Sequence, residues 1–160
     1  MDMQENWHTY WKNPGDSGGP IKVKWSHDDN ISISELYWPT PTLIPYEPLM
    51  TYGYKNFVIF PYEINNSNDK NSFIEANIDF LICDDICVPE KALIKTNLNE
   101  IKNDAELYDW FLKVPSQILP VRASLDSEFI NIRFSWPFDV GSATFFIDNQ
   151  DIIEPVSYTH

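Results

Sequence analysis

The sequence predicts an all-β protein, a β-sandwich with one short helix. Most of the chain consists of short segments in which apolar and polar residues alternate, the pattern of half-buried strands, separated by clusters of Gly, Pro, Asn and Asp. Aromatic residues make up 15% of the 160 residues, and 12 prolines interrupt the chain. One segment shows apolar residues at helical spacing. About eight short strands and one minor helix are typical of a sandwich.

The first half of the chain contains three predicted strands and one long loop. Residues 21–25 alternate cleanly and predict a strand, and residues 31–33 predict a second, shorter one. The proline-rich residues 38–48 predict a loop, because proline is excluded from the interior of a sheet. Residues 54–64 predict a third strand, in which Pro61 indicates an edge or a bulge.

The second half contains the remaining strands and the helix. A strand over residues 73–82 leads into the two cysteines, and a strand over residues 92–98 leaves them. A capping box at residues 103–106, followed by apolar residues at helical spacing, predicts a helix near residues 104–113. Three closing strands are predicted at residues 121–125, 129–136 and 143–147, with a hairpin turn at Asp126 and Ser127.

Length and charge narrow the class of protein. A chain of 160 residues is expected to form a single domain over residues 1–160. Its net charge of −13 argues against nucleic acid or an anionic membrane as a partner. No segment approaches the roughly 20 apolar residues of a membrane helix. The first residues lack the basic start and apolar stretch of a signal peptide, which taken alone favours the cytosol, where disulfides are unusual.

The two cysteines, Cys83 and Cys87, lie close together between an apolar run and a proline. In an extended strand they would be about 13 Å apart, whereas a disulfide requires Cα atoms within about 7 Å. They can therefore pair only if residues 84–86 turn the chain back, and aspartates favour such turns. A structural staple and a redox pair are both possible. Because so small a ring stabilises by about 2 kcal/mol, against nearly 5 for a loop of a hundred residues, the spacing favours redox chemistry.

The surroundings of the cysteines suggest how they react. Alternation over residues 74–83 places Cys83 on the mostly polar face of its strand, where a thiol can be reached. Asp84 and Asp85 disfavour a nearby thiolate, so the pKa values of both thiols are expected to be raised. Strongly oxidising cysteine pairs are oxidising because their reduced thiolate is stabilised, whereas the charges beside this pair disfavour a thiolate. We therefore expect it to prefer the disulfide and to give electrons away.

Other candidate sites are weaker. The string GDSGGP at residues 15–20 matches the nucleophile segment of chymotrypsin-like serine proteases. Ser17 lies too early in the chain for that fold, so we interpret the segment as a plain Gly/Pro turn. Two thiols could hold Cu(I), whereas no zinc spacing and no phosphate loop are present, so no cofactor or metal is predicted. A carbohydrate-binding sandwich is an alternative, although packing also explains its stacking residues, Trp7, Trp11, Trp25 and Trp38.

Three tyrosines follow the proline-rich run. Tyr46, Tyr52 and Tyr54 cluster at its end, and long loops in compact domains are often functional. Packing on a sheet edge is the more ordinary interpretation of such a cluster.

Three segments together resemble a known family. They are residues 10–18 (YWKNPGDSG), residues 76–89 (ANIDFLICDDICVP), and the tail with residues 143–146 (ATFF) and 152–154 (IIE). These segments resemble the periplasmic N-terminal domain of the DsbD family of transmembrane thiol–disulfide reductases, in its ScsB-like branch linked to suppression of copper sensitivity. The similarity spans nearly the whole chain, and the cysteine segment is its most specific part.

The resemblance implies an immunoglobulin-like domain in the periplasm that acts as a protein-disulfide reductase component. It would receive electrons from a thioredoxin-like domain and pass them to periplasmic disulfide isomerases or cytochrome c maturation proteins. It implies that Cys87 forms the mixed disulfide, that Cys83 resolves it, and that an aromatic cap loop shields them. By position the candidate cap residues are Tyr46, Tyr52 and Tyr54. The resemblance also implies the soluble part of a membrane protein, or a stand-alone version. The cysteines stand closer together than in the best-known branch.

Overall fold

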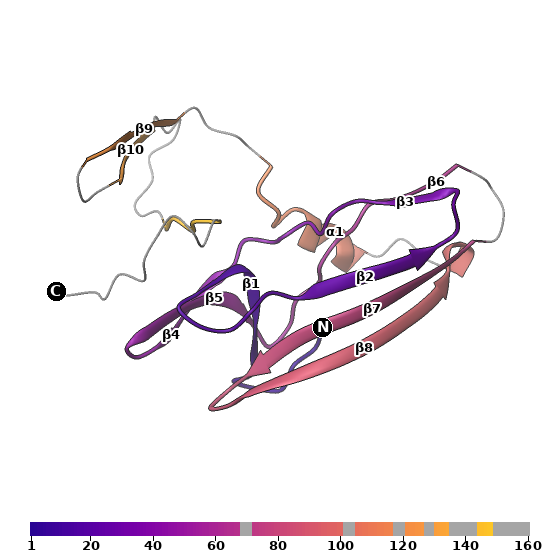
Figure 1. Cartoon of the computed structure of the whole chain (residues 1–160), viewed down its shortest axis with the longest axis horizontal. Coiled ribbons are helices and arrows are strands. Elements are labelled where there is room, and N and C mark those ends of the chain that lie inside the picture. The colour runs from indigo at the N-terminus through magenta and orange to yellow at the C-terminus, as the bar shows by residue number, and fades with distance from the viewer. Residues whose placement is uncertain (68–71, 101–104, 117–120, 127–129, 135–143, 149–160) are drawn as a thin grey trace. The chain divides into compact units, whose positions relative to one another are not determined.

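The computed structural model describes residues 1–67, 72–100, 105–116, 121–126, 130–134 and 144–148 (Figure 1). The chain separates into two compact units, Met1–Val114 with Phe146–His160 and Pro115–Phe145, which are described in turn. The single domain expected from the length of the chain stays a prediction.

The first unit is built mostly of antiparallel strands. Its main sheet has six strands in the order β2-β7-β1-β5-β4, with β8 paired to β7, and β3 and β6 form a separate pair. Among the described residues its elements are β1 (His8–Gly15), β2 (Lys22–His27), β3 (Ile31–Ile33), β4 (Thr42–Tyr46), β5 (Leu49–Lys55), β6 (Ile64–Asn66), β7 (Phe73–Cys83), β8 (Cys87–Asn97), a 3₁₀ turn (Leu98–Glu100) and α1 (Ala105–Phe111).

Strand β7 organises the main sheet. One of its edges pairs with β8 over all of its eleven residues, and the two strands form the longest hairpin in Figure 1. Its other edge pairs with β2 from Ile74 to Asp79 and then with β1, where His8 lies opposite Cys83. Strand β1 continues the sheet to β5. The start of β1 is therefore placed beside the end of β7 that carries the first cysteine.

The core lies against β1 and β5. It centres on Trp11, Tyr54 and Val58, which are almost completely buried. The segment that returns near the C-terminus also packs here. The ring of Phe146 forms T-shaped pairs with the rings of Trp11 and Tyr52, whose centroids lie 6.0 and 5.4 Å from its own.

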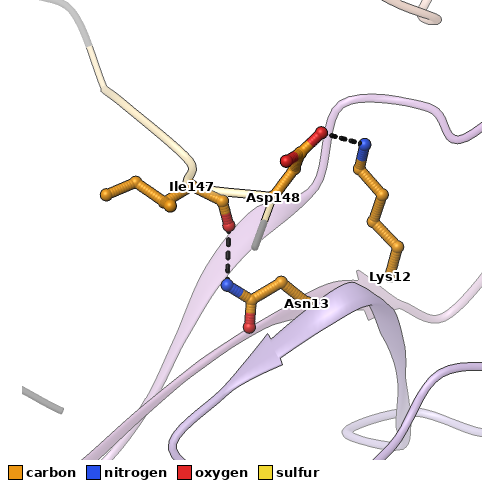
Figure 2. A network of polar contacts seen from close by, with 4 residues as sticks. All are labelled: Lys12, Asn13, Ile147 and Asp148. Atoms are coloured by element: carbon orange, nitrogen blue, oxygen red, sulfur yellow. Dashed lines mark hydrogen bonds and ion pairs between the residues drawn. The ribbon is translucent and has the colours of Figure 1, made fainter. Parts of the chain in front are cut away.

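Polar contacts hold the returning segment on β1 (Figure 2). The Asn13 side-chain amide donates to the Ile147 carbonyl at 2.6 Å, and Lys12 Nζ lies 2.6 Å from a carboxylate oxygen of Asp148. A segment far along the sequence thus completes the edge of the core.

Two predicted elements in the first half are wrong. The single strand expected over residues 54–64 does not form: β5 ends at Lys55, where Asn56 adopts a left-handed conformation (φ 63°), and the next strand, β6, begins only at Ile64. Part of the expected loop over residues 38–48 is strand β4, which contains Pro45. Because β4 is the last strand of the sheet, a residue without an N–H group is tolerated there.

The other predicted strands of this unit are confirmed with shifted ends. Strands β2 and β3 match the expected segments, β7 extends to Cys83, and β8 begins at Cys87 itself instead of residue 92. The helix near residues 104–113 is confirmed as α1, while residues 103 and 104 of its capping box lie outside the described residues. None of the described helices is long and apolar enough to span a membrane.

The second unit contains an antiparallel pair, β9 (Val121–Leu125) and β10 (Ile130–Phe134), in which Val121 lies opposite Phe134. This confirms the hairpin expected from the sequence, although Ser127 of its turn lies outside the described residues. The closing strand expected over residues 143–147 is wrong for residues 144–147, which form no strand. The described contacts of this segment with β1 run through side chains, as at Asn13, and a sequence pattern does not distinguish such a segment from a strand.

Candidate redox site

A disulfide closes the tip of the β7–β8 hairpin. The register of the hairpin runs from Phe73 opposite Asn97 to Cys83 opposite Cys87, and three residues make the turn. The two cysteine Cα atoms lie 4.1 Å apart and their sulfurs are bonded. The chain reversal that the spacing requires is therefore confirmed. Within the turn, the amide of Asp84 donates to the carbonyl of Ile86 at 3.2 Å.

The two sulfur-bearing residues differ in exposure. Cys83 is 1% exposed, whereas Cys87 is exposed, and the neighbouring Ile86 is 70% exposed. The prediction that Cys83 can be reached is therefore wrong. The alternation within one strand shows which residues share a face, but it does not show that β1 lies alongside the end of β7 and covers this position.

Tyr10 of β1 lies against the disulfide. Its hydroxyl donates to Cys83 Sγ at 2.8 Å and lies 3.4 Å from Cys87 Sγ. The side chain is 1% exposed, and burial raises the pKa of Tyr10, although a hydrogen bond with Ser17 opposes this effect. The hydroxyl therefore keeps its proton at neutral pH and is available as a donor to the buried sulfur.

His8 occupies the next position on this side of β1. It lies opposite Cys83 on β7 and opposite Lys55 on β5, and its ring meets the edge of Tyr10 at 5.3 Å. Burial lowers the pKa of His8, Lys55 lowers it further, and Asp84 opposes the shift. The imidazole is consequently neutral near pH 7 and packs as an uncharged ring.

The tip of the hairpin carries uncompensated negative charge. Asp84 and Asp85 are exposed, and within the part of the chain that the structure describes their carboxylates form no ion pair. The ion pairs of the hairpin lie farther along it, at Lys91 with Asp79 and at Lys95 with Glu75. A raised pKa for the two thiols in the reduced form stays a prediction from this charge.

The three candidate cap tyrosines lie on the β4–β5 hairpin. Tyr46, at the end of β4, is 55% exposed. Tyr52 is half-buried with its ring against Phe146, and Tyr54 is 4% exposed and donates to the Pro39 carbonyl at 2.7 Å. Burial raises the pKa of Tyr54 well above its usual range. Tyr52 and Tyr54 thus contact Phe146 and Pro39, and a capping role stays a prediction.

The remaining candidate residues lie elsewhere or serve packing. Among the described residues no group of three or more His, Cys, Asp and Glu side chains could hold a metal ion. Of the tryptophans considered for carbohydrate, Trp11 is in the core, Trp25 meets Tyr62 edge-on at 5.0 Å, and Trp38 meets Phe60 at 5.6 Å. Sequence reasoning missed Tyr10 and His8 as site residues, although Tyr10 opens one of the three segments that carry the family resemblance.

Comparisons with known proteins identify the family of the chain. The family model described as "Thiol:disulfide interchange protein DsbD, N-terminal" matches residues 1–99. The chain belongs to this family. Both cysteines, Tyr10 and the β4–β5 hairpin lie within the DsbD N-terminal match, whereas the returning segment at residues 144–148 lies beyond it.

A solved structure supports the same fold. The crystal structure of the N-terminal periplasmic domain of ScsB from Proteus mirabilis matches with a TM-score of 0.66 at 20% identity, and the match covers 86% of this chain and 56% of that one. The present chain thus spans about half of the ScsB domain. No curated protein matches this chain significantly. The immunoglobulin-like β-sandwich with one short helix is confirmed as the fold class.

Proposed function

We propose that this DsbD-type domain is a thiol–disulfide oxidoreductase of the periplasm, and that Cys83 and Cys87 carry its electrons. In this proposal a thioredoxin-like domain supplies the electrons, and disulfide isomerases or cytochrome c maturation proteins receive them. The observation that carries the proposal is a disulfide with one exposed and one buried sulfur-bearing residue in a chain of this family. The domain would be the soluble part of a membrane protein.

The exposure of the two cysteines supports a division of roles in which Cys87 is attacked first and Cys83 leaves. A thiolate of the electron donor attacks Cys87 Sγ, forming a mixed disulfide, while the Cys83–Cys87 bond breaks and its electron pair goes to Cys83 Sγ. The Tyr10 hydroxyl, 2.8 Å away, donates its hydrogen bond to the departing Cys83 thiolate. The second thiolate of the donor then attacks the donor's sulfur in the mixed disulfide, and Cys87 is released as a thiolate. The donor becomes a disulfide, and after protonation the domain holds two thiols.

The same chemistry run in reverse passes the electrons on. The Cys87 thiolate attacks the disulfide of an acceptor, and Cys83 then attacks Cys87 Sγ to release the acceptor in its reduced form. Because the carboxylates of Asp84 and Asp85 disfavour a thiolate at the tip, this attack is slow until a docked partner supplies a favourable field. Specificity then comes from docking.

Trapping of the mixed disulfide tests this function. The probe is a thioredoxin-fold protein whose resolving cysteine has been removed and whose remaining cysteine is activated as a mixed disulfide with a chromogenic thiol. We expect Cys83→Ala, which leaves Cys87 as a free thiol, to form a covalent complex detected by mass spectrometry. The matched variant Cys87→Ala leaves only the buried Cys83 and should form little complex. Equal trapping by the two folded variants, or none by Cys83→Ala, would overturn the proposed function.

A further inference from the structure

We propose that the loop at the end of β1, residues 15–18, is a positioning element that holds Tyr10 against the disulfide. This inference rests on the proposed function, because it concerns how fast the Cys83–Cys87 bond exchanges. The loop has the sequence Gly-Asp-Ser-Gly, the string that resembles a protease motif without serving as one here. Its contacts tie it to Tyr10 at one end and to the β4–β5 hairpin at the other.

Gly18 lies directly against the ring of Tyr10. A Cβ atom at this position would collide with the Cδ1, Cε1 and Cζ atoms of the ring. Gly18 also has a φ of +90°, which side chains with a Cβ rarely adopt. Glycine is therefore required at this position for two reasons: the positive φ of the turn and the close approach of the backbone to the Tyr10 ring. Any larger residue must move either the loop or Tyr10.

Ser17 orients the hydroxyl of Tyr10. The Ser17 side chain lies near enough to the tyrosine hydroxyl to lower the pKa of Tyr10 by hydrogen bonding, and the Tyr10 hydroxyl donates to Cys83 Sγ 2.8 Å away. A hydroxyl has one proton and can accept in addition. With Ser17 as donor, the only proton of Tyr10 is left for the sulfur. The loop thus acts on the direction of this hydrogen bond as well as on the position of the ring.

Asp16 and Gly15 fix the other end of the loop. Asp16 Oδ2 accepts from the amide of Met50 at 2.7 Å, and the amide of Asp16 donates to the carbonyl of Met50 at 3.0 Å. Gly15, with a φ of +81°, lies so close that a Cβ would strike the Met50 carbonyl oxygen at 2.5 Å. The amide of Gly15 also donates to Asn13 Oδ1 at 3.0 Å. The loop is therefore a short link between the β4–β5 hairpin and the tyrosine.

The loop offers its own matched control. At Gly19 an added Cβ would meet only Leu81 Cδ1 at 3.6 Å, an ordinary contact. We compare Gly18→Ala with Gly19→Ala by the rate constant at which dithiothreitol reduces the disulfide. We expect Gly18→Ala to slow reduction by about tenfold, as loss of the hydrogen bond to the leaving thiolate would. Gly19→Ala should stay within about twofold of the parent, because the added methyl group makes only an ordinary van der Waals contact.

A double variant separates positioning from general damage. In a Tyr10→Phe background the hydroxyl is absent, so Gly18→Ala should slow reduction no further. Equal rates for Gly18→Ala and Gly19→Ala, or an additional slowing in the Tyr10→Phe background, would overturn the inference. If Gly18→Ala does not fold, Ser17→Ala takes its place: we expect slower reduction with unchanged thermal stability, and an unchanged rate would refute the role of the loop.

The outcomes keep the two proposals apart. Successful trapping at Cys87 together with equal rates for the two glycine variants leaves the function standing and removes the positioning role. Failed trapping removes the function whatever the loop variants do.

Discussion

The hydrogen bond from Tyr10 to Cys83 gives a sharp prediction about the rate of exchange. Tyr10→Phe removes one oxygen atom and leaves the ring that fills the space between β1 and the disulfide. The sulfur of Cys83 carries little charge in the disulfide and close to a full negative charge as a leaving thiolate. The hydrogen bond is therefore stronger in the transition state than in the ground state, which is the condition for catalysis.

The size of the effect follows from the kind of bond. A hydrogen bond to a charged group contributes about 1.5–3 kcal/mol. Since the hydroxyl already donates to the disulfide sulfur, we take the lower end of this range. Because about 1.4 kcal/mol corresponds to a tenfold change in rate, Tyr10→Phe should slow reduction of the disulfide by about tenfold. In the reduced protein it should raise the pKa of the Cys83 thiol.

The assay is quenched-flow reduction of the oxidised domain by excess dithiothreitol. The fraction of unreacted disulfide is measured by mass spectrometry after acid quenching. Tyr108→Phe is the matched control, because that side chain is 63% exposed on α1. A rate for Tyr10→Phe equal to that of Tyr108→Phe, or faster than that of the parent, would refute the reasoning.

Three further predictions concern charge, pH and the returning segment. Replacing Asp84 and Asp85 together by Asn should speed reduction by an anionic thiol about threefold at low salt, and the gain should shrink as salt is added. Burial holds the pKa of His8 below its ordinary 6.5, so the unfolded chain binds this proton first and stability falls as pH drops below about 6.5; His8→Gln should reduce that loss in urea titrations. Phe146→Ala should lower the free energy of unfolding by roughly 2 kcal/mol, because a half-buried ring loses its partners.

Each of these predictions has a control elsewhere in the chain. Asp28 and Asp29 form an adjacent, exposed pair near the other end of β7, so their replacement by Asn should leave the reaction with an anionic thiol unchanged. His27 is exposed, and His27→Gln should keep the pH dependence of the parent. Phe73 is 63% exposed, so Phe73→Ala should lower the free energy of unfolding far less than Phe146→Ala. Equal effects at site and control positions would contradict the corresponding prediction.

The sequence alone predicted the hairpin and its disulfide, because the information is local. Alternation over residues 73–82 marks β7, and two cysteines with three residues between them can pair only if the chain turns back. What lies over Cys83 is not local: Tyr10 and Cys83 are 73 residues apart in the chain and meet because β1 pairs beside β7. No pattern within either segment specifies that neighbour.

The same distinction explains the errors around β5. This strand contains Gly53, which lowers strand propensity. In the structure a Cβ at Gly53 would collide with the Thr9 carbonyl, so the glycine allows β1 and β5 to approach. A residue that weakens the local signal is thus the one that the neighbouring strand requires. Reading strand limits from propensity fails where backbones pack this closely.

The position of the disulfide in the β7–β8 ladder bears on how the domain can cycle. Its two residues are the last of eleven facing pairs, so ten pairs still hold the hairpin when the sulfurs separate. We therefore expect gain and loss of electrons to demand no refolding, and the oxidised and reduced forms to differ little in shape. A partner protein that distinguishes the two forms must do so at the few atoms around Cys87, where a bonded sulfur has become a thiol.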